Sequence, residues 1–187
     1  MLAAFSFDFV ILDAIQNLRS PFLDKLMVDI STLGNGSLIW ITYLIIFLST
    51  KEYKKMGKVM LISFALNILI VNLLIKNIVA RPRPFMINPA IDLLIPPLKD
   101  GSFPSGHTSY AFSFASIIIL MARGKSLKIF TAILAILIAL SRLYLYVHFP
   151  TDVIGGAIIG VLIAIISIKI YFSKSKPVKR DKIFLQR

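Results

Sequence analysis

Five apolar stretches dominate the pattern of hydrophobic and polar positions along the chain. They cover residues 37–50, 59–79, 108–122, 129–147 and 153–171. A helix that crosses a bilayer needs about 20 mostly apolar residues, so each stretch predicts a span, although the first is short unless it begins near Ile30. No alternation typical of β-strands competes with this pattern. The predicted fold class is therefore all-α, a polytopic membrane bundle of about five to six transmembrane helices.

The N-terminal region has a mixed pattern instead. Apolar residues recur there at helical spacing, with polar residues between them: Phe5, Phe9, Leu12, Ile15 and Leu18 against Asp8, Asp13, Gln16 and Asn17. This pattern predicts an amphipathic helix in the membrane interface. Ser20-Pro21 should end that helix, a second helical piece should follow over 22–33, and Gly34-Asn35-Gly36 should turn the chain into the first span. An additional short span in this region is the alternative.

The composition requires lipid as part of the solvent. Hydrophobic residues make up 57% of the 187 residues and the mean hydropathy is +0.84, more apolar surface than one soluble domain of this size can cover. Cysteine is absent, which excludes disulfides, thiolate metal sites and cysteine nucleophiles. We expect N-terminal interfacial helices over 1–34, a transmembrane domain over 35–172 and a basic tail over 173–187.

The basic residues predict the orientation of the chain. The formal net charge is +12, and segments 51–58, 123–128 and 169–187 hold four, three and seven of the 21 Lys and Arg residues. With five spans these segments share one side, which the positive-inside rule places in the cytoplasm. The placement favours an anionic membrane surface over nucleic acid as the partner of these charges. We therefore expect a multi-pass protein of the cell membrane with a cytoplasmic C-terminus.

The residues with reactive or charged side chains gather at the opposite, outer ends of the spans. They form three clusters: Lys76, Arg81 and Arg83; Pro104-Ser105-Gly106-His107; and Ser141-Arg142 with His148 and Asp152. A charge at the centre of a span costs about 2.5–3.5 kcal/mol, and a lone cation near a helix end avoids this cost by extending to the headgroups. That explanation is weak for several cations, one aspartate and both histidines of the chain on one face.

These residue types suit the transfer of a phosphoryl group. Lys76, Arg83 and Arg142 can neutralise phosphate oxygens. Ser105-Gly106 opens a helix whose free N–H groups and positive dipole end favour an anion, although Ser105 alone would be a routine N-cap.

The second half of this chemistry lies in the third cluster. His148 and Asp152 are four residues apart, which puts them on one face if a single helix includes both. Pro150 suits a first helical turn, which would instead start the helix only near Phe149. The carboxylate can orient the imidazole and leave its other nitrogen free to attack. A lone pair of this kind is more often a structural hydrogen bond, but a second histidine and a cationic cradle complete a phosphoryl-transfer site.

The three clusters resemble the signature of the type 2 phosphatidic acid phosphatase superfamily, the membrane lipid phosphatases related to vanadium haloperoxidases. Its K-x6-R-P, P-S-G-H and S-R-x5-H-x3-D motifs are matched at Lys76 to Pro84, Pro104 to His107 and Ser141 to Asp152. The resemblance implies that His148 is the nucleophile and forms a phosphohistidine, that Asp152 orients it, and that His107 is the acid and then the base.

The resemblance implies further roles. Phosphate would be bound by the side chains or amides of Lys76, Arg83, Arg142, Ser105 and Gly106. Two residues are accessory candidates: Ser141, whose role the motif leaves undefined, and Arg81, which would contact a second phosphate or headgroup, or only face water. Family members need no metal or other cofactor, and the sequence has no carboxylate cluster to hold one.

The motif residues bind the phosphate group, so they do not identify the lipid to which it is attached. Small outward-facing members often act on undecaprenyl pyrophosphate, which is the favoured substrate; phosphatidylglycerophosphate, phosphatidic acid and lipid A are alternatives, as is transfer to another lipid instead of water. An anionic-lipid binding or transport protein is the alternative without catalysis. The expected partners are a lipid phosphate and membrane lipids, with no nucleic acid and no obligatory protein partner. Residues 85–104 either gate lipid access or only link two spans.

Overall fold

The computed structural model describes residues 2–35 and 38–174, and every regular element in these ranges is a helix. The N-terminal part contains α1 (Leu2–Gln16), α2 (Pro21–Gly34) and α3 (Leu38–Ser49). A long continuous helix follows, made of α4 (Lys54–Leu66), the π-helix η2 (Asn67–Ile75) and α5 (Lys76–Val79). The remaining helices are α6 (Pro84–Ile87), α7 (Gly106–Met121), α8 (Lys125–Tyr144) and α9 (Pro150–Lys174). The predicted all-α class is confirmed.

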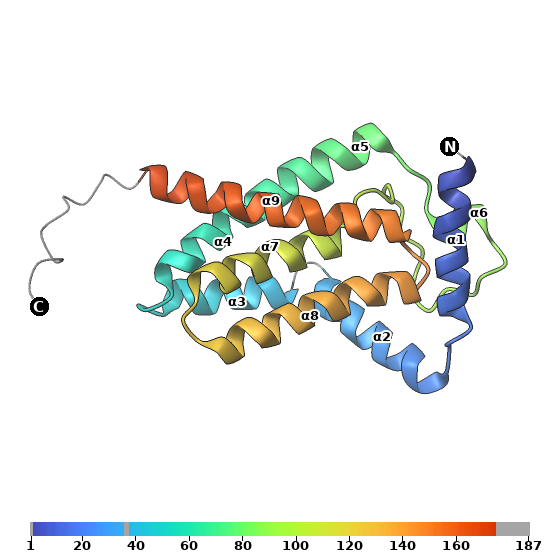
Figure 1. The fold of residues 1–187 in the computed structure, drawn as a ribbon, viewed down its shortest axis with the longest axis horizontal. Coiled ribbons are helices and arrows are strands. Elements are labelled where there is room, and N and C mark those ends of the chain that lie inside the picture. Colours follow the sequence, from blue (N-terminus) through green and yellow to red (C-terminus); the bar gives the residue numbers. More distant parts are fainter. Residues whose placement is uncertain (1, 36–37, 175–187) are drawn as a thin grey trace, which may run out of the picture.

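The long helices run side by side as a bundle, and α1 lies across one end of it (Figure 1). Helix α7 occupies the middle, where it contacts α3, α4, η2, α8 and α9. Two glycines of α9 allow a close approach, because a Cβ atom at Gly156 or Gly160 would lie 2.6 or 2.5 Å from a backbone oxygen of α7 or its cap. Small residues at such contacts are typical of membrane helix pairs.

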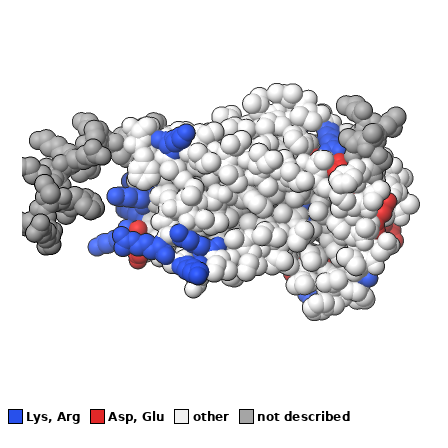
Figure 2. Space-filling model, viewed as in Figure 1, with Lys and Arg blue, Asp and Glu red and all other residues white. Residues whose placement is uncertain are grey.

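The lengths and apolar surfaces of the helices fit a membrane. Among the described residues three helical stretches are long and apolar enough to cross one, Lys54–Ile87, Lys125–Tyr144 and Pro150–Ser173. The predicted first span forms only the 12-residue α3. It reaches spanning length when it is joined to α2 across a bend of 45°, which would make a fourth span, and α7 is a shorter apolar helix. The face seen in Figure 2 is largely uncharged over its middle, and the long helices carry apolar side chains that are more than half exposed, among them Leu73, Ile133 and Ile158.

The N-terminal helices begin and end where the sequence predicted, but α1 faces its neighbours differently. Ser20 caps α2 by accepting a hydrogen bond from the Leu23 amide, and Pro21 occupies the first turn. On α1 the predicted polar position Asp8 is fully buried beside the buried Leu12, whereas Phe7 and Val10 are exposed. The amphipathic assignment of Asp8 to the polar face was therefore wrong, because Arg81 provides a partner for its carboxylate inside the protein.

The end of α5 and the starts of α7 and α9 lie at the end of the bundle that α1 crosses (Figure 1), which brings the three sequence clusters together. Helix α5 ends at Ala80, which adopts a left-handed conformation with φ 43°. Helix α7 starts after its N-cap Ser105, whose amide donates to the carbonyl of Asp152 in the first turn of α9 over 3.1 Å. The residues that follow α5 and precede α7 and α9 thus share one end of the bundle.

Candidate active site

Arg83 is held in one position by hydrogen-bond acceptors around its guanidinium. It is 1% exposed and donates to the carbonyls of Asp100 and Val147 over 2.9 and 2.7 Å. Its Nη2 also donates to the Asp100 carboxylate over 2.7 Å. Extended backbone at Arg83 followed by Pro84 directs the side chain away from the end of α5 and under the loop that precedes α7. Arg83 is therefore a fixed, buried cation at the centre of the site.

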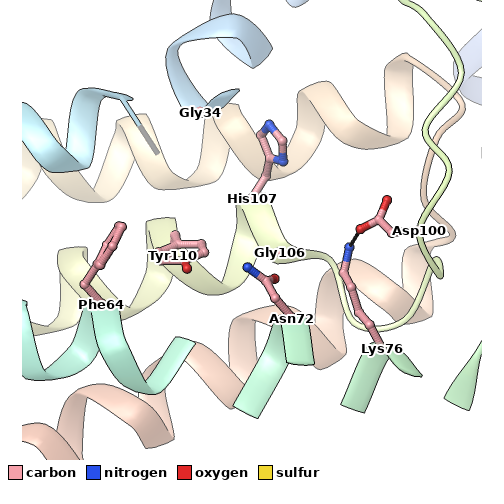
Figure 3. Close-up of a pocket in the computed structure, with 8 residues that line it drawn as sticks. All are labelled: Gly34, Phe64, Asn72, Lys76, Asp100, Gly106, His107 and Tyr110. Atoms are coloured by element: carbon pink, nitrogen blue, oxygen red, sulfur yellow. Dashed lines mark hydrogen bonds and ion pairs between the residues drawn. The ribbon is translucent and has the colours of Figure 1, made fainter. Parts of the chain in front are cut away.

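Lys76 and Asp100 complete this side of the site (Figure 3). The Lys76 ammonium is largely buried and pairs with the Asp100 carboxylate, which is also bound by Arg83. Partial burial raises the pKa of Asp100, but Lys76 and Arg83 outweigh that effect and lower it to about 2. Asp100 was not predicted from the sequence, because an aspartate at the end of a long loop is ordinarily a solvated residue.

His148 presents one ring nitrogen to Arg83. The two side chains meet at 3.2 Å between Nη1 of Arg83 and Nε2 of His148. A guanidinium can only donate, so Nε2 must be the acceptor and carries the lone pair, while the ring proton is on Nδ1. Burial, together with Arg83, Arg142 and Lys76, lowers the pKa of His148 well below its usual value. The imidazole is therefore neutral at neutral pH, with a nucleophilic nitrogen facing the cations.

Asp152 lies on the opposite side of the imidazole. Its Oδ2 is 3.7 Å from Nδ1 of His148 and accepts hydrogen bonds from the Ser102 hydroxyl and the Phe149 amide. The Phe149 contact is half of a capping box, since Asp152 is the third residue of α9. As predicted, α9 begins at Pro150, so His148 precedes the helix. Ser102, which sequence reasoning missed, lies 3.5 Å from the same Nδ1.

Arg142 has buried guanidinium nitrogens that lack a partner among the described residues. It is fully buried near the end of α8, and its Nη1 donates to the hydroxyl of Ser31 in α2. Its Nε and Nη2 have no hydrogen-bond partner among the residues that the structure describes. Buried donors without partners are rare in proteins, and a guanidinium edge of this kind suits an anion.

The P-S-G-H segment starts α7 beside Lys76. The Ser105 hydroxyl accepts from the Thr108 amide over 3.4 Å, so this side chain serves as the routine N-cap that the sequence also allowed. A Cβ atom at Gly106 would lie 4.0 Å from Nζ of Lys76, which places the free N–H groups of the first turn next to this ammonium. An anion bound there would face both groups.

His107 is positioned by residues at the end of α2. Its Nε2 is 2.9 Å from the side-chain oxygen of Asn35. A Cβ atom at Gly34 would lie 2.6 Å from Cδ2 of His107, so only glycine leaves room for the ring in this position. Neither Asn35 nor Ser31 belongs to a motif, so their contacts with His107 and Arg142 were not predicted from the sequence.

A cavity of about 460 Å³ leads from these groups into the bundle (Figure 3). Lys76, Asp100 and His107 line its polar end, and Phe64 and Tyr110 line it further along α4 and α7. Asn72 projects into it from η2, and π-helical segments often occur at functional sites. The cavity thus combines a cationic end with a more apolar end.

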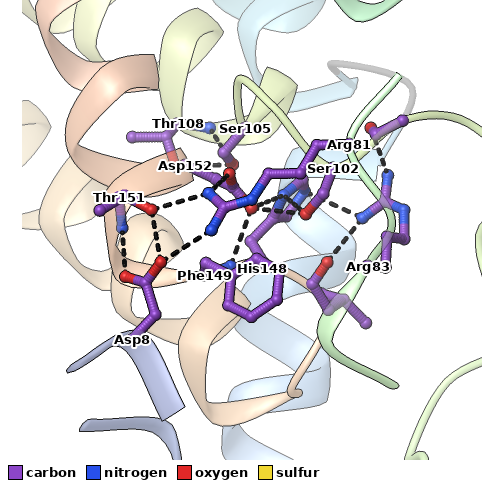
Figure 4. A network of polar contacts seen from close by, with 12 residues as sticks. Asp8, Arg81, Arg83, Ser102, Ser105, Thr108, His148, Phe149, Thr151 and Asp152 are labelled. Carbon is purple, nitrogen blue, oxygen red and sulfur yellow. Dashed lines mark hydrogen bonds and ion pairs between the residues drawn. The ribbon is translucent and has the colours of Figure 1, made fainter. Parts of the chain in front are cut away.

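The two accessory candidates lie apart from this cavity. The Ser141 hydroxyl donates to the carbonyl of Ile138 in its own helix over 2.7 Å. Arg81 directs its guanidinium towards Asp8, Thr151 and Asp152 (Figure 4). In the 85–104 segment, Ile91 packs on a buried cluster that includes Leu12. The segment is therefore anchored to α1 at its middle and to the site cations near its end.

The fold and these side chains define a helical membrane protein with a cationic site at one end of its bundle. The family model described as PAP2 superfamily matches residues 57–176, and the chain belongs to this family. A curated undecaprenyl-diphosphatase of Sulfolobus acidocaldarius is 35% identical over 165 residues, 88% of this chain and 77% of that protein. The phosphatidylglycerophosphatase B of Bacillus subtilis is 32% identical and covers 78% of this chain and 74% of its own length.

A solved structure shows the same arrangement. The transmembrane PAP2 type phosphatidylglycerolphosphate phosphatase of Bacillus subtilis superposes with a TM-score of 0.76 at 28% identity, over 97% of this chain and 90% of that one. The predicted membership in a family of membrane lipid phosphatases is therefore confirmed, together with the membrane-embedded helical fold.

Proposed function

We propose that this chain hydrolyses a lipid diphosphate, with undecaprenyl pyrophosphate as substrate and undecaprenyl phosphate as product, through a phosphohistidine formed on His148. The observation that carries the chemistry is the Nε2 lone pair of His148, directed at Arg83 and lying close to Arg142, whose buried Nε and Nη2 lack partners among the described residues. A nucleophile surrounded by fixed cations is the arrangement that phosphoryl transfer needs, because most of the catalysis is positioning and charge neutralisation.

The proposed first step breaks one P–O bond and forms one P–N bond. Nε2 of His148 attacks the terminal phosphorus while Arg83, Arg142, Lys76 and the amides after Ser105 hold the phosphoryl oxygens. As the P–N bond forms, the imidazole becomes cationic, and Asp152 stabilises the Nδ1–H group. His107, at the polar end of the cavity, gives a proton to the leaving oxygen of the lipid phosphate.

The second step returns the enzyme to its starting state. His107, now unprotonated, takes a proton from a water molecule, and the resulting hydroxide attacks phosphorus. The P–N bond breaks, inorganic phosphate leaves, and Nε2 recovers its lone pair. Gly106 contributes its backbone amide at the helix N-terminus, where an anion is favoured, whereas the Ser105 amide is bonded to the carbonyl of Asp152 and its side chain caps the helix.

Two observations support a prenyl diphosphate over a glycerolipid. The undecaprenyl-diphosphatase relative shares 35% identity over 88% of this chain, slightly more in both respects than the phosphatidylglycerophosphatase. Three buried cations around His148 also suit the greater charge of a diphosphate. Phosphatidylglycerophosphate, phosphatidic acid and lipid A remain the alternatives, because all present the same terminal phosphate to these cations.

The proposed topology places this site at the outer face of the membrane. The turns between α3 and α4 and between α7 and α8, which hold exposed cations, lie at the end of the bundle opposite α1 (Figure 1), and Figure 2 shows Lys and Arg side chains gathered at that end. The positive-inside rule assigns this end to the cytoplasm. Residues 1–34 would then cover the outer end, residues 35–172 would span the membrane, and the basic tail over 173–187, most of which lies outside the described residues, would be cytoplasmic.

The decisive experiment measures phosphate release by the purified protein in detergent. Undecaprenyl pyrophosphate, phosphatidylglycerophosphate and phosphatidic acid are offered in parallel, each to wild type and to His148→Ala. Preference for the first lipid supports the proposal, and preference for a glycerolipid replaces its substrate. Normal activity of His148→Ala would refute the mechanism, and binding without release by the wild-type protein would favour the non-catalytic alternative.

A further inference from the structure

A buried arginine joins α1 to the aspartate of the site. Nη1 of Arg81 donates to Oδ1 of Asp152 over 2.6 Å, and Nη2 donates to Oδ2 of Asp8 over 2.8 Å (Figure 4). Both carboxylates are fully buried, and the Arg81 side chain is 15% exposed. One guanidinium therefore bridges two carboxylates that come from helices more than 140 residues apart in the sequence.

The bridge is fixed on its remaining sides as well. Thr151 donates to Asp8 twice, from its amide over 3.1 Å and from its hydroxyl over 2.7 Å. The plane of the Arg81 guanidinium lies over the Phe149 ring, with Cζ 4.1 Å from the ring centroid. Hydrogen bonds to three side chains, together with the aromatic contact, hold the guanidinium in one orientation. Asp8 thus helps to hold the guanidinium that bonds to Oδ1 of Asp152, while Ser102 and Phe149 bond to Oδ2 of the same carboxylate.

The charges of this network matter for the chemistry at His148. Asp152 has to balance the positive imidazole that forms when Nε2 bonds to phosphorus. Arg81 alone would neutralise Asp152 and weaken that balance. Asp8 shares the arginine, so the three groups together keep one net negative charge next to Nδ1 of His148.

We propose that Arg81 and Asp8 are positioning residues of the reaction, in which Asp8 on α1 holds Arg81 so that Arg81 fixes Asp152 against His148 without cancelling its charge. This inference rests on the proposed function, since it requires His148 to be the nucleophile. Under this inference α1 contributes a positioning residue, Asp8, to the site. Neither a headgroup contact nor a water-facing role is needed to explain Arg81.

Charged and titratable groups face His148 from every element packed near it. The effect of each variant on the pKa of His148 is therefore predicted from the charge that the substitution removes. These groups are Asp8 (α1), Lys76 (α5), Arg81 and Arg83, Asp100, His107 (α7), Arg142 (α8) and Asp152 (α9). Asp8→Asn removes a negative charge and should make protonation of His148 harder. Arg81→Gln removes a positive charge and should make it easier.

The test compares pH profiles of kcat/KM for Asp8→Asn, Arg81→Gln, the double variant and wild type, over about pH 4 to 8. The acid limb should move to lower pH in Asp8→Asn and to higher pH in Arg81→Gln, and it should return towards the wild-type position in the double variant, which is charge-balanced. Each single variant should lose about 10- to 100-fold in kcat with little change in KM, because the nucleophile is misplaced while the cationic side chains that bind the phosphate keep their positions.

Two further variants separate charge, geometry and stability. Asp13→Asn makes the same change on α1, at an exposed carboxylate that accepts a hydrogen bond from Tyr146 over 2.9 Å, and should leave kcat and the acid limb near wild type. Arg81→Lys keeps the charge but cannot bridge two carboxylates, so kcat should fall while the acid limb stays in place. If Arg81→Gln unfolds in detergent, Arg81→Lys and Asp8→Asn still test the inference.

The outcomes separate this inference from the proposed function. Full activity in His148→Ala would overturn both. An inactive His148→Ala together with unchanged kcat and pH profiles in the folded Asp8 and Arg81 variants would overturn the positioning role alone. A loss of thermal stability in these variants without any effect on kcat or the acid limb would assign the network to folding only, which also refutes the inference.

Discussion

Asp100 and Arg83 form a 2.7 Å ion pair in which the carboxylate lies where the phosphate is proposed to bind. Lys76 pairs with the same carboxylate. The Asp100 side chain is 53% exposed, so it can swing away without breaking the core. A carboxylate and a phosphate present similar oxygens to a guanidinium, and we therefore expect the substrate to displace Asp100.

Asp100→Asn should strengthen the binding of anions to the free enzyme. Removing the competing charge leaves Lys76 and Arg83 available, and a half-exposed pair of this kind is worth about 1 kcal/mol, roughly a 5-fold change in affinity. Inhibition of phosphate release by inorganic phosphate, measured as Ki, checks this expectation. Asp92→Asn, an exposed aspartate of the same loop, is the matched control. A weaker Ki in Asp100→Asn would show that Asp100 organises the cations instead of competing for them.

The neutral state of His148 predicts how stability depends on pH. Burial and the neighbouring cations lower its pKa below the ordinary 6.5, so between these values the unfolded chain binds a proton that the folded protein does not. Stability gained from the neutral ring is thus complete above about pH 6.5 and is lost as the pH falls towards the folded pKa. Asp100 adds a second pH dependence at lower pH. The stability gained from its ionised carboxylate is complete above the ordinary pKa of 3.8 and is lost as the pH falls to about 2.

Thermal unfolding of wild type and His148→Gln in detergent isolates the histidine contribution. The difference in Tm between the two proteins should stay constant above about pH 7 and shift in favour of His148→Gln below about pH 6. Parallel Tm curves over the whole range would mean that His148 titrates normally in the folded protein. In that case the argument for a neutral nucleophile would fail.

The contact of α7 with α9 makes a separate prediction about stability. In Gly160→Ala the new Cβ would lie 2.5 Å from the Ser109 carbonyl oxygen and 3.1 Å from the Ser113 amide, so two backbones have to move apart. Overpacking of this kind costs about 1–3 kcal/mol and should lower Tm by about 3 °C or more. Gly124→Ala is the control, because its nearest neighbour would be 4.0 Å away. Equal Tm values in the two variants would contradict such close packing.

The sequence predicted the helices well and the surroundings of the site poorly. Apolar runs, Ser20-Pro21 and Pro150 mark helix bodies and starts through local physics, so α2, α8 and α9 were found close to their true ends. The first span was predicted to be short unless it began near Ile30, and α3 is indeed short; helix length alone does not reveal that α2 precedes it at a bend of 45°.

The motif residues are recognisable because their chemical types are unusual beside apolar helices. Their partners are ordinary polar residues in segments without a motif: Asp8, Ser31, Asn35, Asp100 and Ser102. Each acquires its role only when distant segments meet in the folded chain. A buried Asp8 could have been suspected from its place among apolar neighbours on α1, but its connection to Arg81 depends on the tertiary fold.

The proposed orientation of the site is testable because the chain contains no cysteine, so single introduced thiols report on single positions. Lys99→Cys lies on the exposed loop beside Asp100, and Lys55→Cys lies on the exposed basic end opposite it. In intact cells a membrane-impermeant maleimide should label the first variant and not the second, and permeabilisation should make both reactive. Phosphate release by each variant shows that the labelled protein is folded. Labelling of Lys55→Cys alone in intact cells would show the opposite topology, in which the phosphate is removed on the cytoplasmic side of the membrane.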